Sequence, residues 1–428
     1  MPRLDIAIAG CGPAGLAAAI LLDAQGHRVT IFDQFDCPGP VGSGLMIQPS
    51  GLAVLARMGL ARETLARGAR IDALCGIEAG GKRVLDAPYS TLGLAGACGI
   101  GIHRASLFSV LHEEAERRGI AIETAHDVTG SVIEAGGRRL TFAGRPNSPL
   151  FDLVVDASGW QSAFDDSPEA GHASLLEFGA LWASLPLRPD DPFAGNMLEQ
   201  RYRRAANMVG VLPIGTRKGS DSAEAAFFWS LKRVDFAAWQ DTPLDKWKDE
   251  VRALWPETAC LLDRIERREQ LTFAVYAHRS MKNPVRERYI AIGDAWHSAS
   301  PQLGQGANMA LLDAWSLAQG LESGRTLQES LRLAHGWRHD HVWLYQWVTR
   351  LFTPLYQSDR GWHAQLRDHL LAPLSQIWPI SKIQAQLMSG LFGFPLAPLG
   401  LAPPDYEALS ASSSASDTSA IASSLSHS

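Results

Sequence analysis

The sequence has no excess of basic residues, no paired cysteines and no long uninterrupted apolar run, and each absence excludes a class of protein. The net charge is −6, whereas broad nucleic-acid binding requires a basic face. The five cysteines form neither a zinc-site spacing nor a disulfide framework, so we predict no metal site and expect a reducing, cytoplasmic location. No run free of charge, glycine and proline approaches the roughly 20 residues that a spanning helix needs. Asp5 interrupts the N-terminal apolar residues, which argues against a signal peptide.

What is present begins with a glycine motif between an expected strand and an expected helix. Residues 4–9 are an apolar strand pattern, the run GCGPAG follows, and residues 16–25 are apolar almost throughout. A second strand pattern, at 29–32, ends at Asp33. In this context the glycines permit a tight turn and close approach of the backbone to a pyrophosphate, and the acidic residue accepts the ribose hydroxyls. We therefore predict an ADP-binding site at Gly10, Gly12, Ala14, Gly15 and Asp33.

A second motif lies at residues 288–321. The apolar strand pattern at 289–292 ends at Gly293 and Asp294, and a loop with Gly304 and Gly306 follows. From Ala307 onward the apolar residues recur at helical spacing. A strand, an acidic residue, a glycine loop and a helix start together predict a site for an electron-rich ligand, because the first N–H groups of a helix are unpaired.

With both motifs placed, residues 4–355 resemble the para-hydroxybenzoate-hydroxylase-like (group A) FAD-dependent monooxygenases, which include the ubiquinone-pathway hydroxylases. The fingerprint with Asp33 carries part of the resemblance. The more specific part is Gly293-Asp294 followed by His297, Pro301, Gly304-Gln305-Gly306, Asn308 and Asp313-Ala314.

The resemblance implies bound FAD, NAD(P)H as electron donor, and hydroxylation or epoxidation of an aromatic or apolar small molecule by O2 through a flavin hydroperoxide. Asp294 would meet the ribityl chain, and Pro301 would lie near the reacting flavin face. The backbone of the next loop would face the pyrimidine edge, at Gly304, Gln305, Gly306, Ala307 and Asn308. Arg104 and Val128 stand where the family has further FAD contacts. No side chain is identified as an acid–base catalyst, and His297 is interpreted as structural.

Residues 156–165 depart from the family pattern. Ser158 replaces the usual aspartate, an arginine is absent, and Asp165 and Asp166 stand nearby. Two acidic residues would repel a phosphate, which leaves the docking of NAD(P)H open. Alternatives are therefore another FAD-dependent reaction (a reductase-fed oxygenase, a halogenase or a double-bond reductase) and a non-catalytic flavin- or nucleotide-binding module.

The expected fold class is α/β: a Rossmann-like FAD-binding domain with an inserted β-sheet substrate domain and a C-terminal helical region. The FAD-binding domain is expected at 1–70, 99–173 and 277–325, and the sheet domain at 71–98 and 174–276. Helices are expected over 326–406, and a disordered serine-rich tail over 407–428. The aromatic residues of 330–352 are interpreted as core, and the apolar stretch 382–405 as packing, with a peripheral membrane contact left open. The substrate and the oligomeric state are not predicted.

Overall fold

A six-stranded sheet forms the centre of the nucleotide-binding part of this computed structural model, which describes residues 2–37, 39, 42–164, 173–220, 222–371, 373 and 377–410. Its strand order is β19-β20-β11-β1-β2-β8. The pairs from β20 to β8 are parallel, and β19 is antiparallel at one edge. The strands are β1 (Asp5–Ala9), β2 (Arg28–Phe32), β8 (Ala121–Glu123), β11 (Leu153–Asp156), β19 (Val285–Arg286) and β20 (Tyr289–Ala291).

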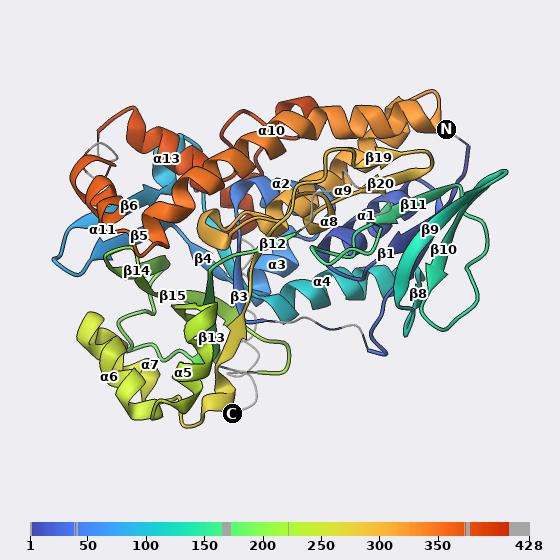
Figure 1. Ribbon diagram of the computed structural model, residues 1–428. Helices are drawn as coiled ribbons and strands as arrows, with labels where there is room; N and C mark the ends of the chain where they lie inside the picture. The colour runs from blue at the N-terminus through green and yellow to red at the C-terminus, as the bar shows by residue number, and fades with distance from the viewer. Residues whose placement is uncertain are drawn as a thin grey trace, which may run out of the picture.

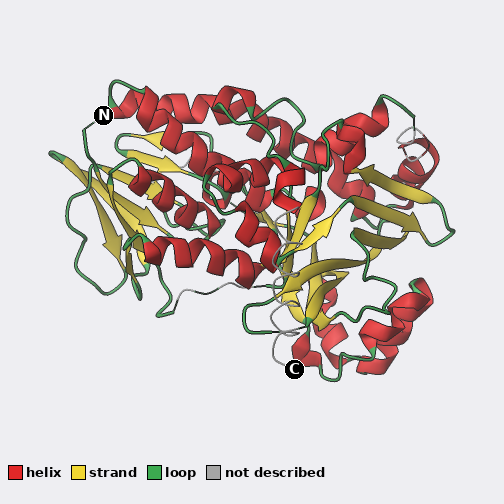
Figure 2. Cartoon of the chain, turned by 180° about the vertical axis from the view of Figure 1, so that it is seen from behind, coloured by secondary structure: helices red, strands yellow, loops and turns green. Residues whose placement is uncertain are grey.

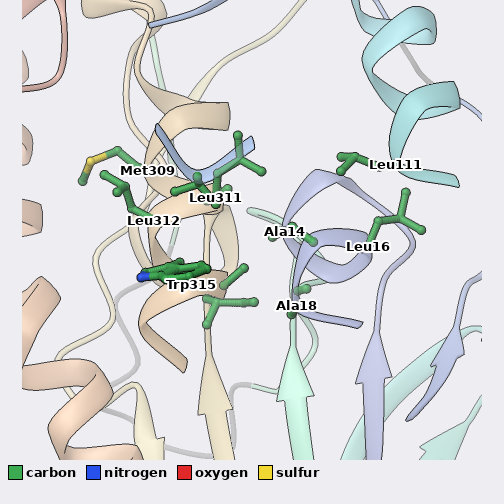
Figure 3. Close-up of a cluster of buried hydrophobic side chains, with 14 of the residues drawn as sticks. Ala14, Leu16, Ala18, Leu111, Met309, Leu311, Leu312 and Trp315 are labelled. Carbon is green, nitrogen blue, oxygen red and sulfur yellow. The ribbon is translucent and has the colours of Figure 1, made fainter. Parts of the chain in front are cut away.

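Helices with small apolar residues cover one face of this sheet. Helix α1 (Pro13–Ala24) packs against α9 (Gly306–Ser323) and α4 (Arg104–Arg117). Figure 3 shows Leu311 of α9 turned toward Ala14 of α1, and Leu16 of α1 turned toward Leu111 of α4. The other face carries the hairpin β9 (Val128–Glu134) and β10 (Gly137–Phe142), seen at the right of Figure 1.

A seven-stranded sheet forms the second layer, in the order β17-β13-β16-β15-β14-β5-β6. Neighbouring side chains alternate between its faces. One face buries Leu181, Val211 and Phe227 beneath α5 (Phe236–Asp241), α6 (Leu244–Leu254) and α7 (Ala259–Leu262). The other face packs toward the nucleotide-binding part. The strands are β5 (Ala73–Glu78), β6 (Arg83–Pro88), β13 (Phe178–Pro186), β14 (Met197–Arg203), β15 (Asn207–Thr216), β16 (Ala223–Lys232) and β17 (Thr272–Ala274).

A small sheet of β3 (Gly44–Ile47), β7 (Gly99–His103) and β4 (Ala69–Ile71) joins the two larger sheets. Glycines allow the close approach: a Cβ atom on Gly44 would lie 2.6 Å from Ile214 Cγ2, and one on Gly101 would collide with the Pro213 carbonyl oxygen. Helices α2 (Pro49–Arg57) and α3 (Ala61–Arg67) follow β3. The contact brings the second face of the seven-stranded sheet beside the nucleotide-binding part.

The C-terminal region is helical. Helix α10 (Leu327–Tyr356) runs the length of the molecule, and α11 (Gly361–Leu366) and α13 (Ile380–Met388) gather near its end (Figures 1 and 2). Tyr345 is buried, but Trp343 and Trp347 are 60% and 53% exposed. The interpretation of the α10 aromatics as core was therefore wrong for these two tryptophans, because helical spacing does not show which side a neighbour covers.

The α/β fold class with an FAD-binding domain and a C-terminal helical region is confirmed. The domain boundaries stay a proposal. In the seven-stranded sheet, β5 and β6 come from residues 71–98 and the other strands from residues 174–276. The expected tail begins too early, because residues 406–410 are helical. The serine-rich remainder, like Asp165 and Asp166, lies outside the described residues.

Within the described chain, no helix is both long enough and apolar enough to cross a bilayer.

Candidate flavin site

The candidate site lies at the carboxyl edge of the six-stranded sheet, where β1, β2, β11 and β20 all end. Gly10 N donates to Phe32 O (2.8 Å), which fastens the first glycine motif to the end of β2. Ile292 N donates to Asp156 O (2.9 Å), which fastens the second motif to the end of β11. Ligands of open α/β sheets bind at this edge. The two motifs predicted from sequence therefore share one side of one sheet.

The fingerprint glycines have three different environments. A Cβ atom on Gly10 would lie 2.5 Å from Ala157 O, and Gly10 also has φ +103°. A Cβ atom on Gly15 would collide with the Gly10 carbonyl oxygen, so this position lets α1 pack closely. At Gly12 a Cβ atom would meet nothing within 4 Å. Only Gly12 faces open space, as a position beside a pyrophosphate should. Ala14, the fourth predicted residue, is buried at the start of α1.

Asp33 turns back onto the same loop. Its Oδ2 accepts from Cys11 N at 2.7 Å, and its Oδ1 accepts from Phe35 N at 3.1 Å. A carboxylate has about four acceptor positions, so acceptor capacity remains for ribose hydroxyls. Val128, which begins β9, is half-buried two residues after His126, and His126 N donates to Asp33 O at 2.8 Å. Val128 therefore lies near Asp33, and its contact with the adenine end of the cofactor stays a prediction.

The second motif turns sharply at Gly293 and presents Asp294. Gly293 has φ +59°, and a Cβ atom there would lie 3.1 Å from Ala14 Cβ. The Asp294 side chain is solvent-exposed, yet its surroundings desolvate it enough to raise the pKa of its carboxyl group, against the lowering effect of His297 and Arg104.

A buried charge network supports this turn from behind. Asp313 Oδ2 accepts from Gly293 N (2.9 Å) and lies 2.6 Å from His297 Nε2, while Oδ1 accepts from Arg338 Nε (2.8 Å). Burial alone would raise the pKa of Asp313, but the charges of His297 and Arg338 lower it to about 2. The structure therefore supports the interpretation of His297 as structural: it fixes the Gly293 turn through Asp313.

The loop between Pro301 and α9 exposes its backbone and buries its polar side chains. Pro301 and Gly306 are exposed, Gly304 has φ +60°, and no side chain caps the start of α9. Asn308 is fully buried: its Oδ1 accepts from Gln48 N (2.8 Å), and its Nδ2 donates to Met46 O and Gly304 O. Gln305 Nε2 donates to Met388 O (2.8 Å). These two side chains shape the loop, and any contact they make with a cofactor must come from their backbone.

Arg104 is the first residue of α4 and lies beside the glycine-rich segment at Gly42. Its N–H donates to Ser43 O (2.8 Å), and its exposed side chain lies over Gly42, where a Cβ atom would be 3.1 Å from Arg104 Cδ. Burial raises the pKa of both Asp294 and Tyr276, and the positive charge of Arg104 opposes this rise at both groups.

The altered Ser158 region is a closed hydrogen-bond network. Ser158 N–H and O–H donate to Asp156 Oδ1 at 3.0 and 2.6 Å, and Ser162 and Tyr289 hydroxyls donate to Oδ2 at 2.5 and 3.0 Å. Asp156 is fully buried. The single hydroxyl proton of Ser158 is therefore used in the bond to Asp156. Toward a ligand, this hydroxyl can act only as a hydrogen-bond acceptor.

An aromatic wall that the sequence pattern did not identify lies on the face of the seven-stranded sheet that packs against the nucleotide-binding part. Trp182 Nε1 donates to the Tyr276 hydroxyl (2.8 Å), and the Trp182 and Phe228 rings lie 4.7 Å apart. Burial raises the pKa of Tyr276 to about 12, with smaller opposing effects of Trp182 and Arg104. Alternation along residues 178–186 was visible in the sequence, but the face turned toward the flavin site was not.

These features fit an extended flavin dinucleotide: Gly12 leaves room at one end, the uncapped start of α9 offers N–H donors at the other, and both lie on one sheet edge. Fold and site thus define a flavin-binding α/β protein. The sequence profile of the FAD binding domain family matches residues 3–344, and the chain belongs to this family.

Two curated relatives and one solved structure narrow the class of protein. Hispidin-3-hydroxylase of Neonothopanus nambi is 27% identical over 370 residues, covering 76% of this chain and 82% of its own length. Salicylate hydroxylase of Pseudomonas putida is 25% identical over 351 residues, covering 76% and 78%. Klebsiella pneumoniae HpxO complexed with FAD and uric acid shares the fold, with a TM-score of 0.73, 18% identity and coverage of 91% of this chain and 98% of that one. The protein is an FAD-dependent monooxygenase of group A.

Proposed function

We propose that this enzyme uses NAD(P)H and O2 to hydroxylate or epoxidise an aromatic or otherwise apolar small molecule. The aromatic wall of Trp182, Phe228 and Tyr276 carries the proposal, because Trp182 and Phe228 pack against the core of the nucleotide-binding part and Trp182 is hydrogen-bonded to Tyr276. Planar rings pack well against such side chains. Hydroxylase relatives that act on salicylate and hispidin support the aromatic substrate class.

The cofactor, when bound, supplies the electron transfer and oxygen activation. The residues of this chain bind and orient it. We propose that Gly12 admits the pyrophosphate, that Asp33 and Asp294 accept from sugar and ribityl hydroxyls, and that the α9 N–H groups face the pyrimidine edge. Reduction makes that edge anionic, and fixed donors at a helix start stabilise such charge without reorganisation. Exposed Pro301 would shape the space in which O2 and the substrate meet.

A second candidate keeps FAD but receives its electrons from a separate flavin reductase. The Ser158 network supports it, since the hydroxyl that would donate to a pyridine nucleotide already donates to Asp156. The two candidates differ in whether the purified chain oxidises NADH or NADPH.

The test is to reconstitute the purified protein with FAD and follow NADH and NADPH oxidation with and without aromatic compounds. Incorporation of ¹⁸O from labelled O2 into a product is the expected result. Reduction of bound FAD only after a flavin reductase is added would favour the second candidate. Failure to bind FAD would overturn both.

We also propose a cytoplasmic location. The five cysteines are free, and three of them, Cys11, Cys75 and Cys98, are buried. Burial raises the pKa of each of these three thiols, which keeps them protonated and unreactive.

A further inference from the structure

Exposed large apolar side chains are concentrated in the C-terminal helices. Ten of the eighteen such side chains in the described part of the chain lie between residues 343 and 394, including all four exposed tryptophans. They are Trp343, Trp347, Leu351, Trp362, Leu366, Ile377, Trp378, Ile380, Ile383 and Phe394, here named the C-terminal apolar surface. Scattered apolar residues are ordinary on a protein surface, but a concentration of this kind marks an interaction site.

The helices that carry these residues are packed together. Trp343, Trp347 and Leu351 are spaced by four and form one stripe on the outside of α10. The Tyr345 hydroxyl donates to Leu387 O (3.1 Å), which holds α13 against α10. Arg367 Nη1 donates to Leu355 O (3.2 Å), which holds the segment after α11 against the same helix. Figure 1 shows α11 and α13 beside the end of α10.

The exposed charges within residues 343–394 are mostly positive, although the whole chain has a net charge of −6. Arg350, Arg360 and Lys382 are exposed among the apolar residues. Exposed Asp359 ion-pairs with Lys232, and half-buried Asp368 ion-pairs with Arg367. A basic rim around apolar residues complements an anionic lipid surface, and tryptophan prefers the boundary between lipid headgroups and chains.

A second copy of the chain is a poorer occupant. A two-fold symmetric interface places the same patch against itself. Arg350, Arg360 and Lys382 of both copies would then be enclosed in one interface, where like charges repel, whereas anionic headgroups would neutralise them.

The helix α13, which carries Ile380 and Ile383 of this surface, also contacts the loop that precedes α9. Met388 O at the end of α13 accepts from Gln305 Nε2 (2.8 Å), and Ser389 O accepts from Ser50 N (3.2 Å). We propose that the C-terminal apolar surface docks the enzyme on the surface of an anionic lipid bilayer, with α10, α11 and α13 lying in the headgroup region. The inference does not depend on the substrate class.

The test is co-sedimentation of the FAD-loaded enzyme with vesicles of phosphatidylcholine containing about one third phosphatidylglycerol. The expected result is binding to these vesicles and at least about tenfold weaker binding by the double variant Trp343→Gln, Trp347→Gln. Val234→Gln is the matched control, since Val234 is 77% exposed outside the surface. Its binding should equal that of the unaltered enzyme.

Charge is tested separately with the double variant Arg350→Gln, Lys382→Gln. It should bind the anionic vesicles about tenfold more weakly, whereas Lys246→Gln, at an exposed site on α6, should not. Flavin content and thermal unfolding confirm that each variant is folded. Three results overturn the proposal: no vesicle binding by the unaltered enzyme, undiminished binding by the tryptophan variant, or conversion of a dimer to a monomer by that variant in sedimentation velocity.

Discussion

The backbone of Gly293 lies directly against the side chain of Ala14, so that the two glycine motifs meet although they come from distant parts of the chain. A Cβ atom on Gly293 would lie 3.1 Å from Ala14 Cβ and 3.3 Å from Ala310 Cβ, and its φ of +59° disfavours any side chain. This contact fixes the distance between the start of α1 and the start of α9. One extended ligand can then contact both helix starts.

Replacing Gly12 should separate cofactor binding from folding. Gly12→Ala adds a methyl group that meets no protein atom, at a φ of −81° that alanine adopts freely. The affinity for FAD should fall by at least about tenfold, or about 1.4 kcal/mol, while the unfolding free energy of the apoprotein changes by less than about 1 kcal/mol. Fluorescence titration and urea unfolding measure the two. Gly195→Ala, at an exposed open site, is the control and should change neither.

Asp294 should make the apoprotein less stable as pH rises. Desolvation raises the pKa of its carboxyl group in the folded state. The contribution of the protonated carboxyl group to the free energy of unfolding is therefore complete below the unfolded pKa of about 4, and it is lost as pH rises through the folded pKa. Asp294→Asn should therefore unfold at a higher urea concentration than the unaltered apoprotein at pH 7, but at the same concentration near pH 3. It should also bind FAD more weakly. Equal unfolding midpoints of Asp294→Asn and the unaltered apoprotein at both pH values would contradict a raised pKa of Asp294.

Asp313 should behave in the opposite way. Its pKa is lowered to about 2 by His297 and Arg338 despite burial, so its stabilisation is present above about pH 4 and is lost as pH falls toward 2. Asp313→Asn leaves Arg338 buried without its charge partner and should cost about 3–5 kcal/mol at neutral pH. Urea unfolding measures this cost. Glu63→Gln is a control for a surface ion pair and should cost less than about 1 kcal/mol.

The aromatic wall should affect the substrate more than the cofactor. Trp182→Phe removes the hydrogen bond to the Tyr276 hydroxyl and part of the ring surface, so the KM for an aromatic substrate should rise roughly two- to tenfold. FAD content should stay unchanged. Trp229→Phe is the matched control, because Trp229 lies on the same sheet but packs into the opposite face. If both variants raised KM equally, the wall would not be the substrate surface.

The predictable parts of the site are those encoded by short contiguous segments of the sequence. The Gly10–Gly15 run and the Gly293–Asn308 run each contain strand, turn and helix signals within a few residues, and the fold follows from placing them on one sheet. Trp182 and Tyr276 could not be assigned, because which face of an inserted sheet meets the flavin part is decided by the packing of Gly44 and Gly101.

Long-range pairing explains the other failures. The Asp313–Arg338 pair joins two helices whose crossing no local pattern specifies. Whether Trp343 is buried depends on whether another segment of the chain packs on its side of α10, and the local sequence does not show this. At Ser158 the sequence showed that the aspartate and the arginine of the family pattern are absent. It did not show that the Ser158 hydroxyl is hydrogen-bonded to Asp156.

Both motifs should bind one flavin dinucleotide, and comparing the binding of FAD and FMN by the apoprotein tests this expectation. We predict one FAD per chain and at least about tenfold weaker binding of FMN, since FMN lacks the half that the Gly10–Gly15 turn and Asp33 would hold. We also predict that Gly12→Ala weakens the binding of FAD but not that of FMN. Equal affinity for FAD and FMN would contradict this expectation, because the first motif would then contribute nothing to flavin binding.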